Sequence, residues 1–499
     1  GMASISDKNG VLQFYTNGLS VYQANGAIMS GGNNTLPGSD DGGGVSAAQG
    51  VFCLGMPKNP NKFFIFTTDA GNVGTVKGFN YVIVDMLGNG GLGQVSAVTR
   101  LQDLSSSDYR TSEMQAAVVA NNNCDIWLVT RAAQINKFYS YRITSAGINP
   151  IPVESTYAGS KPGGYPSRDE GRGSITFSNS GTKIALTHHN QSWPATDAIG
   201  LFDFDRTTGI VTLMTEIGET GGNNFARAYD AAWSPDDSKL YVTFVNQKDV
   251  AQYDVSSWLP SSAASILASR TVVPGTSGGA ISPSGQLLMG PNNVLYRSIK
   301  GSTYLASLTG NLNGVASGLV FNPTAIDLSA FGKSDAALPN MIPKAISFAE
   351  IDTTGINPIC DTDSPFNFSA NIVGGTWGSD CNGCITDVSN GTFDPSIAGA
   401  GNHKVFYALS SCNSDTVNIT INSCSPTCED TTLADTIDNI CINEVLNLTS
   451  FQVTSDPGSW TIVSNPAGSN PAKITGGNNF DATGSVDPGV YRVRFTLNS

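Results

Sequence analysis

The chain has 499 residues, too many for one ordinary domain, and 40% of them are hydrophobic, which is enough for packed cores. Only 13% are charged whereas 55 are glycine, a composition typical of turn-rich, all-β extracellular proteins. The net charge of −14 argues against a nucleic-acid partner, and no apolar run of about 18 residues is present that could insert into a membrane.

A short unit recurs through residues 1–345: a turn containing Gly, Asn or Asp, followed by an apolar strand. The copies begin at Ser6, Pro57, Ala120, Ser178, Ser234, Ser282 and Asn322. They are 40 to 63 residues apart, the length that a four-stranded propeller blade requires. The repeat predicts a seven-bladed β-propeller over 1–345, with its weak seventh copy completed by the N-terminal segment. A long β-sandwich is the alternative.

Two shorter modules follow, predicted at 346–426 and 427–499. Gly375-Thr-Trp and Phe393-Asp-Pro in the first correspond to Gly458-Ser-Trp and Phe480-Asp-Ala in the second, at offsets of 83 and 87 residues. One buried Trp among short alternating strands is typical of an immunoglobulin-like β-sandwich. The fold class expected is therefore all-β: a seven-bladed β-propeller followed by two immunoglobulin-like modules, the second truncated at its C-terminal end.

Cysteines are unevenly spread. Cys53 and Cys124 are expected to be small buried hydrophobic residues, and the seven cysteines beyond residue 350 are expected to form disulfides in an oxidising compartment. The module register predicts a Cys360–Cys412 disulfide and leaves Cys441 without its partner, which would lie beyond the end of the chain.

Two close pairs of cysteines remain, Cys381 with Cys384 and Cys424 with Cys428. Local disulfides within each pair are the favoured interpretation. A four-thiolate zinc site built from both pairs is the alternative.

Several segments together resemble a family of large secreted Bacteroidetes proteins that carry an N-terminal propeller-like region, immunoglobulin-like repeats and a gliding-associated sorting domain for type IX secretion. The similar stretches are 3–18, 64–69, 89–93, 201–205 and 338–340, together with the Gly-Thr-Trp, Phe-Asp-Pro and Ala-Gly-Ala-Gly motifs of 375–401. The sorting domain is missing from this sequence. The resemblance implies surface display, adhesion or gliding motility, and it supplies no catalytic residue.

One loop region is the candidate ligand site, because propeller loops often meet around the central channel. Its residues are Tyr165, Arg168, Asp169, Arg172, His188, His189 and Trp193. Aromatic rings and arginines there could hold a glycan or a carboxylate. The alternative is a polar loop whose side chains satisfy one another. His403 is expected to be a surface residue without a partner.

No nucleophile elbow, metalloprotease helix or phosphate-binding loop is present in the sequence. No metal or other cofactor is therefore expected, with one exception. Asp7 and the Asp236-Asp237 pair could hold calcium through their oxygens, although such residues more often cap turns.

The sequence favours a non-enzymatic protein, secreted or displayed on the outer-membrane exterior, that is monomeric and binds an extracellular glycan or protein ligand. The propeller would be the recognition domain and the modules would be spacers. The alternative is a propeller hydrolase or lactonase acting on a carbohydrate or other small molecule, with Asp169, Glu170 and Asp230 as candidate acid, base or ligand residues. A third interpretation is a structural propeller without a ligand.

Overall fold

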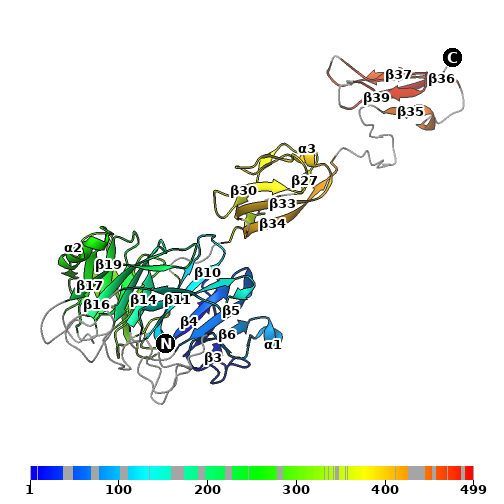
Figure 1. Cartoon of the computed structure of the whole chain (residues 1–499). Helices are drawn as coiled ribbons and strands as arrows, with labels where there is room; N and C mark the ends of the chain where they lie inside the picture. Colours follow the sequence, from blue (N-terminus) through cyan, green and yellow to red (C-terminus); the bar gives the residue numbers. More distant parts are fainter. Residues whose placement is uncertain are drawn as a thin grey trace. The chain divides into compact units, whose positions relative to one another are not determined.

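The structure is a computed structural model, all-β in class, with 50% strand and 6% helix. It describes residues 2–7, 9–37, 49–68, 78–101, 111–133, 135–158, 173–188, 197–219, 228–244, 247–277, 285–330, 332–334, 337–340, 342, 348–354, 356, 358–410, 412–424, 444–451, 457–468, 470–484 and 489–497. Within these ranges no helix has the length and apolar character needed to span a bilayer. The chain divides into two compact units, Gly1–Phe348 with Ser410–Asn413, and Ala349–Leu409 with Ser414–Ser499 (Figure 1).

The described strands of the first unit form six antiparallel sheets. In chain order these are β1 (Ala3–Ser6), β2 (Leu12–Thr16) and β3 (Val21–Gln23); β4 (Val51–Met56), β5 (Asn59–Thr67), β6 (Asn80–Asp85), β7 (Gln94–Val95) and β8 (Thr99–Arg100); β9 (Thr111–Val119), β10 (Ile126–Ala132), β11 (Lys137–Thr144), β12 (Gly147–Ile148) and β13 (Val153–Thr156); β14 (Gly173–Phe177), β15 (Lys183–His188), β16 (Asp197–Phe204) and β17 (Val211–Glu219); β18 (Ala228–Trp233), β19 (Lys239–Phe244), β20 (Val250–Asp254) and β21 (Thr271–Val272); and β22 (Leu287–Met289), β23 (Leu295–Arg297), β24 (Tyr304–Thr309) and β25 (Val320–Asp327). The short helices are α1 (Gly88–Gly91), η1 (Pro260–Ser262), α2 (Ala263–Ala268) and η2 (Ala316–Gly318).

Each sheet packs on the next one along the chain. Five apolar clusters fill the seams between consecutive sheets, and each draws buried side chains from two neighbours. In the seam between the β14–β17 and β18–β21 sheets, for example, Leu201 and Ile217 meet Trp233 and Tyr253. The first strands β4, β9, β14, β18 and β22 are edge strands, and residues of all five line one shared cavity. Sheets packed in chain order with their first strands around a common axis form a β-propeller.

The predicted count of seven blades is not confirmed. The described residues of the first unit form six sheets, and the predicted seventh start at Asn322 lies inside β25, the last strand of the sixth sheet. The predicted sixth start at Ser282 lies outside the described residues. The start at Asn322 was misplaced because a turn followed by an apolar strand occurs at both ends of a blade.

The second unit contains two modules with related pairing. The first comprises β26 (Ile351–Asp352), β27 (Ile359–Cys360), β28 (Phe366–Asn367), β29 (Ser369–Ala370), β30 (Thr376–Ser379), β31 (Ile385–Asp387), β32 (Thr392–Phe393), α3 (Pro395–Ala398), β33 (Gly401–Ser410) and β34 (Asn413–Asn422). The second comprises β35 (Val445–Asn447), η3 (Leu448–Phe451), β36 (Gly458–Ser464), β37 (Lys473–Thr475), β38 (Asn479–Asp481) and β39 (Arg492–Leu497). The sheet order β28-β32-β31 corresponds to β35-β38-β37, and the pair β30–β33 corresponds to β36–β39.

The Gly-x-Trp motif has the same structural cause in both modules. Trp377 pairs with Tyr407 across β30 and β33, and Trp460 pairs with Phe495 across β36 and β39. A Cβ atom at Gly375 would lie 2.5 Å from the Tyr407 ring, and the same atom at Gly458 would lie 2.4 Å from the Phe495 ring. Glycine is therefore required because an aromatic ring from the paired strand covers it. The immunoglobulin-like topology itself stays a prediction.

The disulfides differ from those predicted. Cys360 pairs with Cys424 and Cys124 pairs with Cys412, so the predictions of Cys360–Cys412, of Cys424–Cys428 and of Cys124 as a free buried residue were wrong. The physical reason is that the parallel pairing of β27 with β34 places Cys360 opposite Asn422, close to Cys424. Cys412 instead lies in the turn between β33 and β34, which belongs to the first unit.

The remaining cysteine predictions fared differently. The Cys381–Cys384 disulfide is confirmed, and Cys53 is free and buried as predicted. Because Cys424 pairs with Cys360 and Cys381 pairs with Cys384, three of the four thiolates of the zinc alternative are not available. Cys428 and Cys441 lie outside the described residues.

Candidate functional site

Most of the predicted ligand residues lie outside the described residues: Tyr165, Arg168, Asp169, Arg172, His189 and Trp193, and also Glu170. The exception is His188, the last residue of β15, whose backbone pairs with Gly173 at the start of β14. The segments 159–172 and 189–196 are joined to these two paired residues. The pairing of β14 with β15 therefore places side by side Gly173 and His188, the two residues next to the segments that contain the predicted site residues.

The described part of the propeller contains a central cavity of about 70 Å³, which has room for a few water molecules. Its lining comes from the first strands of five sheets and from a C-terminal segment of the first unit: Gln49, Phe52, Gln115, Ala116, Ala117, Ile175, Thr176, Phe177, Asp230, Gln286, Leu287, Leu288, Leu338, Pro339 and Asn340. Asp230 is the sole carboxylate in this lining, among glutamine amides and apolar side chains.

Gln49, which precedes β4, bonds to the first strands of the next two sheets, β9 and β14. Its side-chain amide accepts a hydrogen bond from the Ile175 N–H at 2.9 Å and donates one to the Ile175 carbonyl at 3.0 Å. The Gln115 side chain donates to the Gln49 carbonyl at 2.8 Å. Since β14 is an edge strand, Ile175 would otherwise have a free N–H and C=O in the channel, and a buried polar group without a partner costs about 1–3 kcal/mol.

Asp230 makes an equivalent link between the β18–β21 and β22–β25 sheets. Its carboxylate accepts a hydrogen bond from the Leu287 N–H at 2.7 Å and contacts the Ser174 hydroxyl. Burial raises the pKa of this carboxyl from 3.8 to about 6, because loss of water disfavours the charged form more than these hydrogen bonds stabilise it. A carboxyl group of this kind can exchange a proton near neutral pH.

The ring is completed by the segment before residue 341. The Gln286 side chain accepts a hydrogen bond from the Leu338 N–H at 2.6 Å, and the Asn340 side chain donates to the Val51 carbonyl at 2.8 Å. Leu338 and Asn340 therefore bridge the sixth sheet and the β4–β8 sheet. The N-terminal sheet β1–β3 also packs on the β4–β8 sheet, and completion of a seventh blade by the N-terminal segment stays a prediction.

Two fully buried arginines were not identified from the sequence, although a cation inside an otherwise apolar strand is a readable signal. Arg131 donates from Nε to the Tyr157 hydroxyl at 3.2 Å, and Arg297 donates from Nη1 to the Lys248 carbonyl at 2.7 Å. Burial lowers the pKa of Arg297 to about 10. Both guanidinium groups have further N–H groups without a partner among the described residues.

The acidic turn residues act as caps. Asp7 accepts hydrogen bonds from the backbone N–H groups of Asn9 and Val11. Asp237 accepts them from Asn179 and Ser180, which lie in the corresponding turn of the neighbouring sheet. These contacts favour the capping interpretation over calcium binding.

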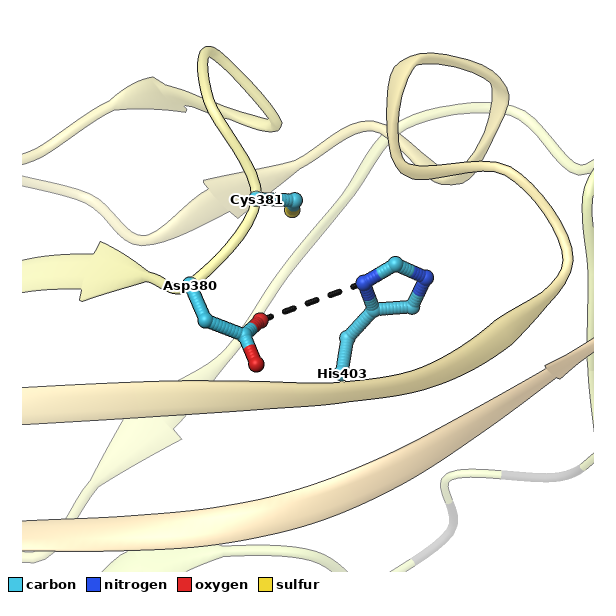
Figure 2. A group of neighbouring side chains, drawn as sticks. All are labelled: Asp380, Cys381 and His403. Carbon is cyan, nitrogen blue, oxygen red and sulfur yellow. Dashed lines mark ion pairs between the residues drawn. The ribbon is translucent and has the colours of Figure 1, made fainter.

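In the second unit, Asp380, Cys381 and His403 place potential metal-ligand atoms within 4.8 Å of one another (Figure 2). The sulfur of Cys381 is bonded to Cys384, however, so it is not available as a thiolate ligand in this state. The expectation that His403 has no partner was wrong: its Nδ1 atom lies 3.9 Å from the Asp380 carboxylate.

The chain matches no model of a known protein family and no curated protein. Among solved structures it is similar to a putative 6-phosphogluconolactonase from Bacteroides uniformis, at 12% identity and a TM-score of 0.37 over 65% of this chain and 86% of that one. A periplasmic gluconolactonase from Pseudomonas aeruginosa gives 11% identity and a TM-score of 0.31 over 70% and 94%. The Swd1 β-propeller domain from Myceliophteria thermophila gives 9% and 0.34 over 60% and 79%.

Proposed function

We propose that this protein is a non-enzymatic binding protein of the cell exterior, in which the propeller recognises a glycan or protein ligand and the two modules act as spacers. Three disulfides among the described residues favour an oxidising compartment. A role in adhesion or gliding motility and export by type IX secretion are part of this proposal, and they rest on the sequence resemblance alone.

The observation that carries the proposal is how the channel side chains use their hydrogen bonds. Gln49, Asp230, Gln286 and Asn340 each bond to backbone groups of another strand or segment around the ring. They link the sheets around the ring, and the cavity that they line within the described residues measures about 70 Å³, far less than a sugar-sized substrate needs. In the described part of the channel, polar side chains therefore support the fold instead of forming an acid–base pair.

We assign recognition to residues 159–172 and 189–196, which are joined in the chain to Gly173 and His188. The predicted ligand residues are joined to these two strand ends, which the sheet register holds as a pair. Aromatic and arginine side chains supply stacking and bidentate hydrogen bonds, the chemistry suited to sugars and carboxylates.

The test is binding of the full chain to a glycan array, first with calcium and then with EDTA. We expect binding that Arg168→Ala and Trp193→Ala each abolish. Arg100→Ala, which removes an exposed arginine on β8, is the matched control and should bind like the wild type. No binding in either buffer, or equal loss in the control, would contradict the assignment and favour a structural role.

Lactone hydrolysis is the second candidate, because one observation favours it. Asp230 lies in the channel with a pKa of about 6, within the range useful for a general acid or base. Turnover of sugar lactones by the wild type that is lost in a folded Asp230→Asn variant would support hydrolysis. Our proposal expects no turnover by either protein.

A further inference from the structure

The Cys381–Cys384 disulfide of the first module has unequal access to solvent at its two sulfurs. Cys384 is fully buried in the module core, whereas Cys381 is partly exposed two residues after the end of β30. Attack by an incoming thiolate is therefore directed to one sulfur, Sγ of Cys381. The buried Cys384 is placed to act as the leaving group.

A histidine is positioned beside the accessible sulfur. His403 Nε2 lies 3.0 Å from the Gly399 carbonyl, which can only accept a hydrogen bond, so this nitrogen carries the hydrogen. Nδ1 therefore faces the Asp380 carboxylate and the Cys381 sulfur, with the three atoms within 4.8 Å of one another (Figure 2). When Nδ1 is protonated, the imidazolium can stabilise a thiolate at Cys381 and is itself stabilised by Asp380.

The loop is held in place from the neighbouring strand. The Asp380 carboxylate accepts a hydrogen bond from the Lys404 N–H at 2.9 Å, and the Ser379 hydroxyl donates to the Lys404 carbonyl at 2.7 Å. Because Lys404 follows His403 directly, these contacts fix the cysteine loop and the histidine relative to each other.

The fold of the module does not need this disulfide. The second module builds the same Trp-centred pairing, with Trp460 and Phe495 in place of Trp377 and Tyr407. Ser464 follows the Trp460 strand where the first module has Cys381, the buried Ala472 directly precedes β37 as Cys384 directly precedes β31, and Tyr491 stands where the first module has His403. The disulfide also closes the shortest loop of the three in the described residues, so it constrains the unfolded chain least.

We propose that Cys381 and Cys384 form a thiol–disulfide exchange site that oxidises dithiols of a partner protein or peptide. One thiolate of the partner attacks Sγ of Cys381, so a mixed disulfide forms as the Cys381–Cys384 bond breaks and Cys384 leaves. The second thiolate of the partner then attacks the partner's own sulfur in the mixed disulfide and releases Cys381 as a thiolate beside His403.

The exchange is balanced. The partner dithiol is oxidised to a disulfide, Cys381 and Cys384 are reduced to a dithiol, and the two protons of the partner end on these two cysteines. No metal or further oxidant is required. The activity is independent of ligand binding by the propeller.

The first test uses the oxidised full chain with limiting dithiothreitol as the dithiol probe and EDTA in all samples. Acid quenching, alkylation and peptide mapping give the rate of reduction of each disulfide. Cys360–Cys424 is the internal control, because both of its cysteines are also partly exposed. We expect Cys381–Cys384 to be reduced about tenfold faster or more. Reduction at the same rate as the control, or slower, would overturn the proposal.

The second test isolates the role of His403. In Cys384→Ser, Cys381 is free, and we expect it to form a mixed disulfide with oxidised glutathione faster than Cys360 does in the matched variant Cys424→Ser. Adding His403→Ala should move the pH midpoint of the Cys381 reaction upward, because the thiolate loses its cationic neighbour. An unchanged midpoint would show that His403 does not act on the sulfur. If Cys384→Ser does not fold, the wild-type reduction rates still decide the matter.

Discussion

The Asp230 carboxylate accepts a hydrogen bond of 2.7 Å from the Leu287 N–H, and this contact ties the first strands of two neighbouring propeller sheets together. The same residue was considered from the sequence as an acid or base of an enzyme. Its position gives it a structural role that can be tested separately from any activity.

The first prediction concerns the pH dependence of stability at Asp230. Its pKa is raised in the folded protein from 3.8 to about 6, so the folded state binds more protons than the unfolded state between these values. The contribution of Asp230 to the free energy of unfolding is therefore fully present below pH 3.8 and is lost as the pH rises through about 6. The loss amounts to about 3 kcal/mol in total. Asp230→Asn should lack this component. Urea unfolding of the wild type and of Asp230→Asn, at a pH below 3.8 and at a pH above 6, measures this contribution. If the free energy of unfolding changed with pH equally in both proteins, the assignment would be contradicted.

The second prediction concerns the seam between the β14–β17 and β18–β21 sheets. The Thr187 hydroxyl donates to the Tyr229 carbonyl at 3.0 Å and accepts from the Ser174 N–H at 2.9 Å. Thr187→Val keeps the shape but removes both hydrogen bonds, including the one from the buried Ser174 N–H, so we expect a loss of about 2 kcal/mol. Hydrogen exchange of peptides from the first unit in urea measures this loss.

Thr212→Val is the matched control, because Thr212 is exposed on β17. It should change stability by less than about 0.5 kcal/mol. Equal effects of the two substitutions would show that the seam does not depend on the Thr187 hydroxyl.

The third prediction concerns the Gly-x-Trp motif. A Cβ atom at residue 375 would lie 2.5 Å from the Tyr407 ring and 2.8 Å from the Ala408 carbonyl. Gly375→Ala should therefore destabilise the first module by about 1–3 kcal/mol. Gly218→Ala is the control, since a Cβ there meets nothing within 4 Å. Hydrogen exchange of β30, the strand of Trp377, distinguishes the two variants. Unchanged protection of this strand in Gly375→Ala would show that the Tyr407 ring does not require glycine at residue 375.

The fourth prediction concerns disulfide connectivity. Peptide mapping without reduction should recover Cys124 linked to Cys412, Cys360 linked to Cys424 and Cys381 linked to Cys384. A peptide linking Cys360 to Cys412 would restore the pairing expected from the module register. Cys412→Ser should release Cys124 for alkylation and leave the other two pairs intact.

The sequence predicted features that depend on local pattern. The all-β class, the propeller and the aromatic residues shared by the two modules follow from turn chemistry, apolar strands and repeat spacing. The Cys381–Cys384 disulfide is local as well. The last repeat start, Asn322, was wrong because a turn followed by a strand does not reveal which end of a blade it occupies.

The sequence by itself determined strands, repeats and the residues that cap turns, because these depend on neighbours a few positions apart. Only the tertiary structure decided that Cys124 joins Cys412 across 288 residues, and that Leu338 and Asn340 close the ring between the sixth sheet and β4. It also decided that Asp230 is a buried link between sheets and that His403 lies beside Cys381. These relationships depend on which strand edges meet in space, and no local pattern in the chain encodes such a meeting.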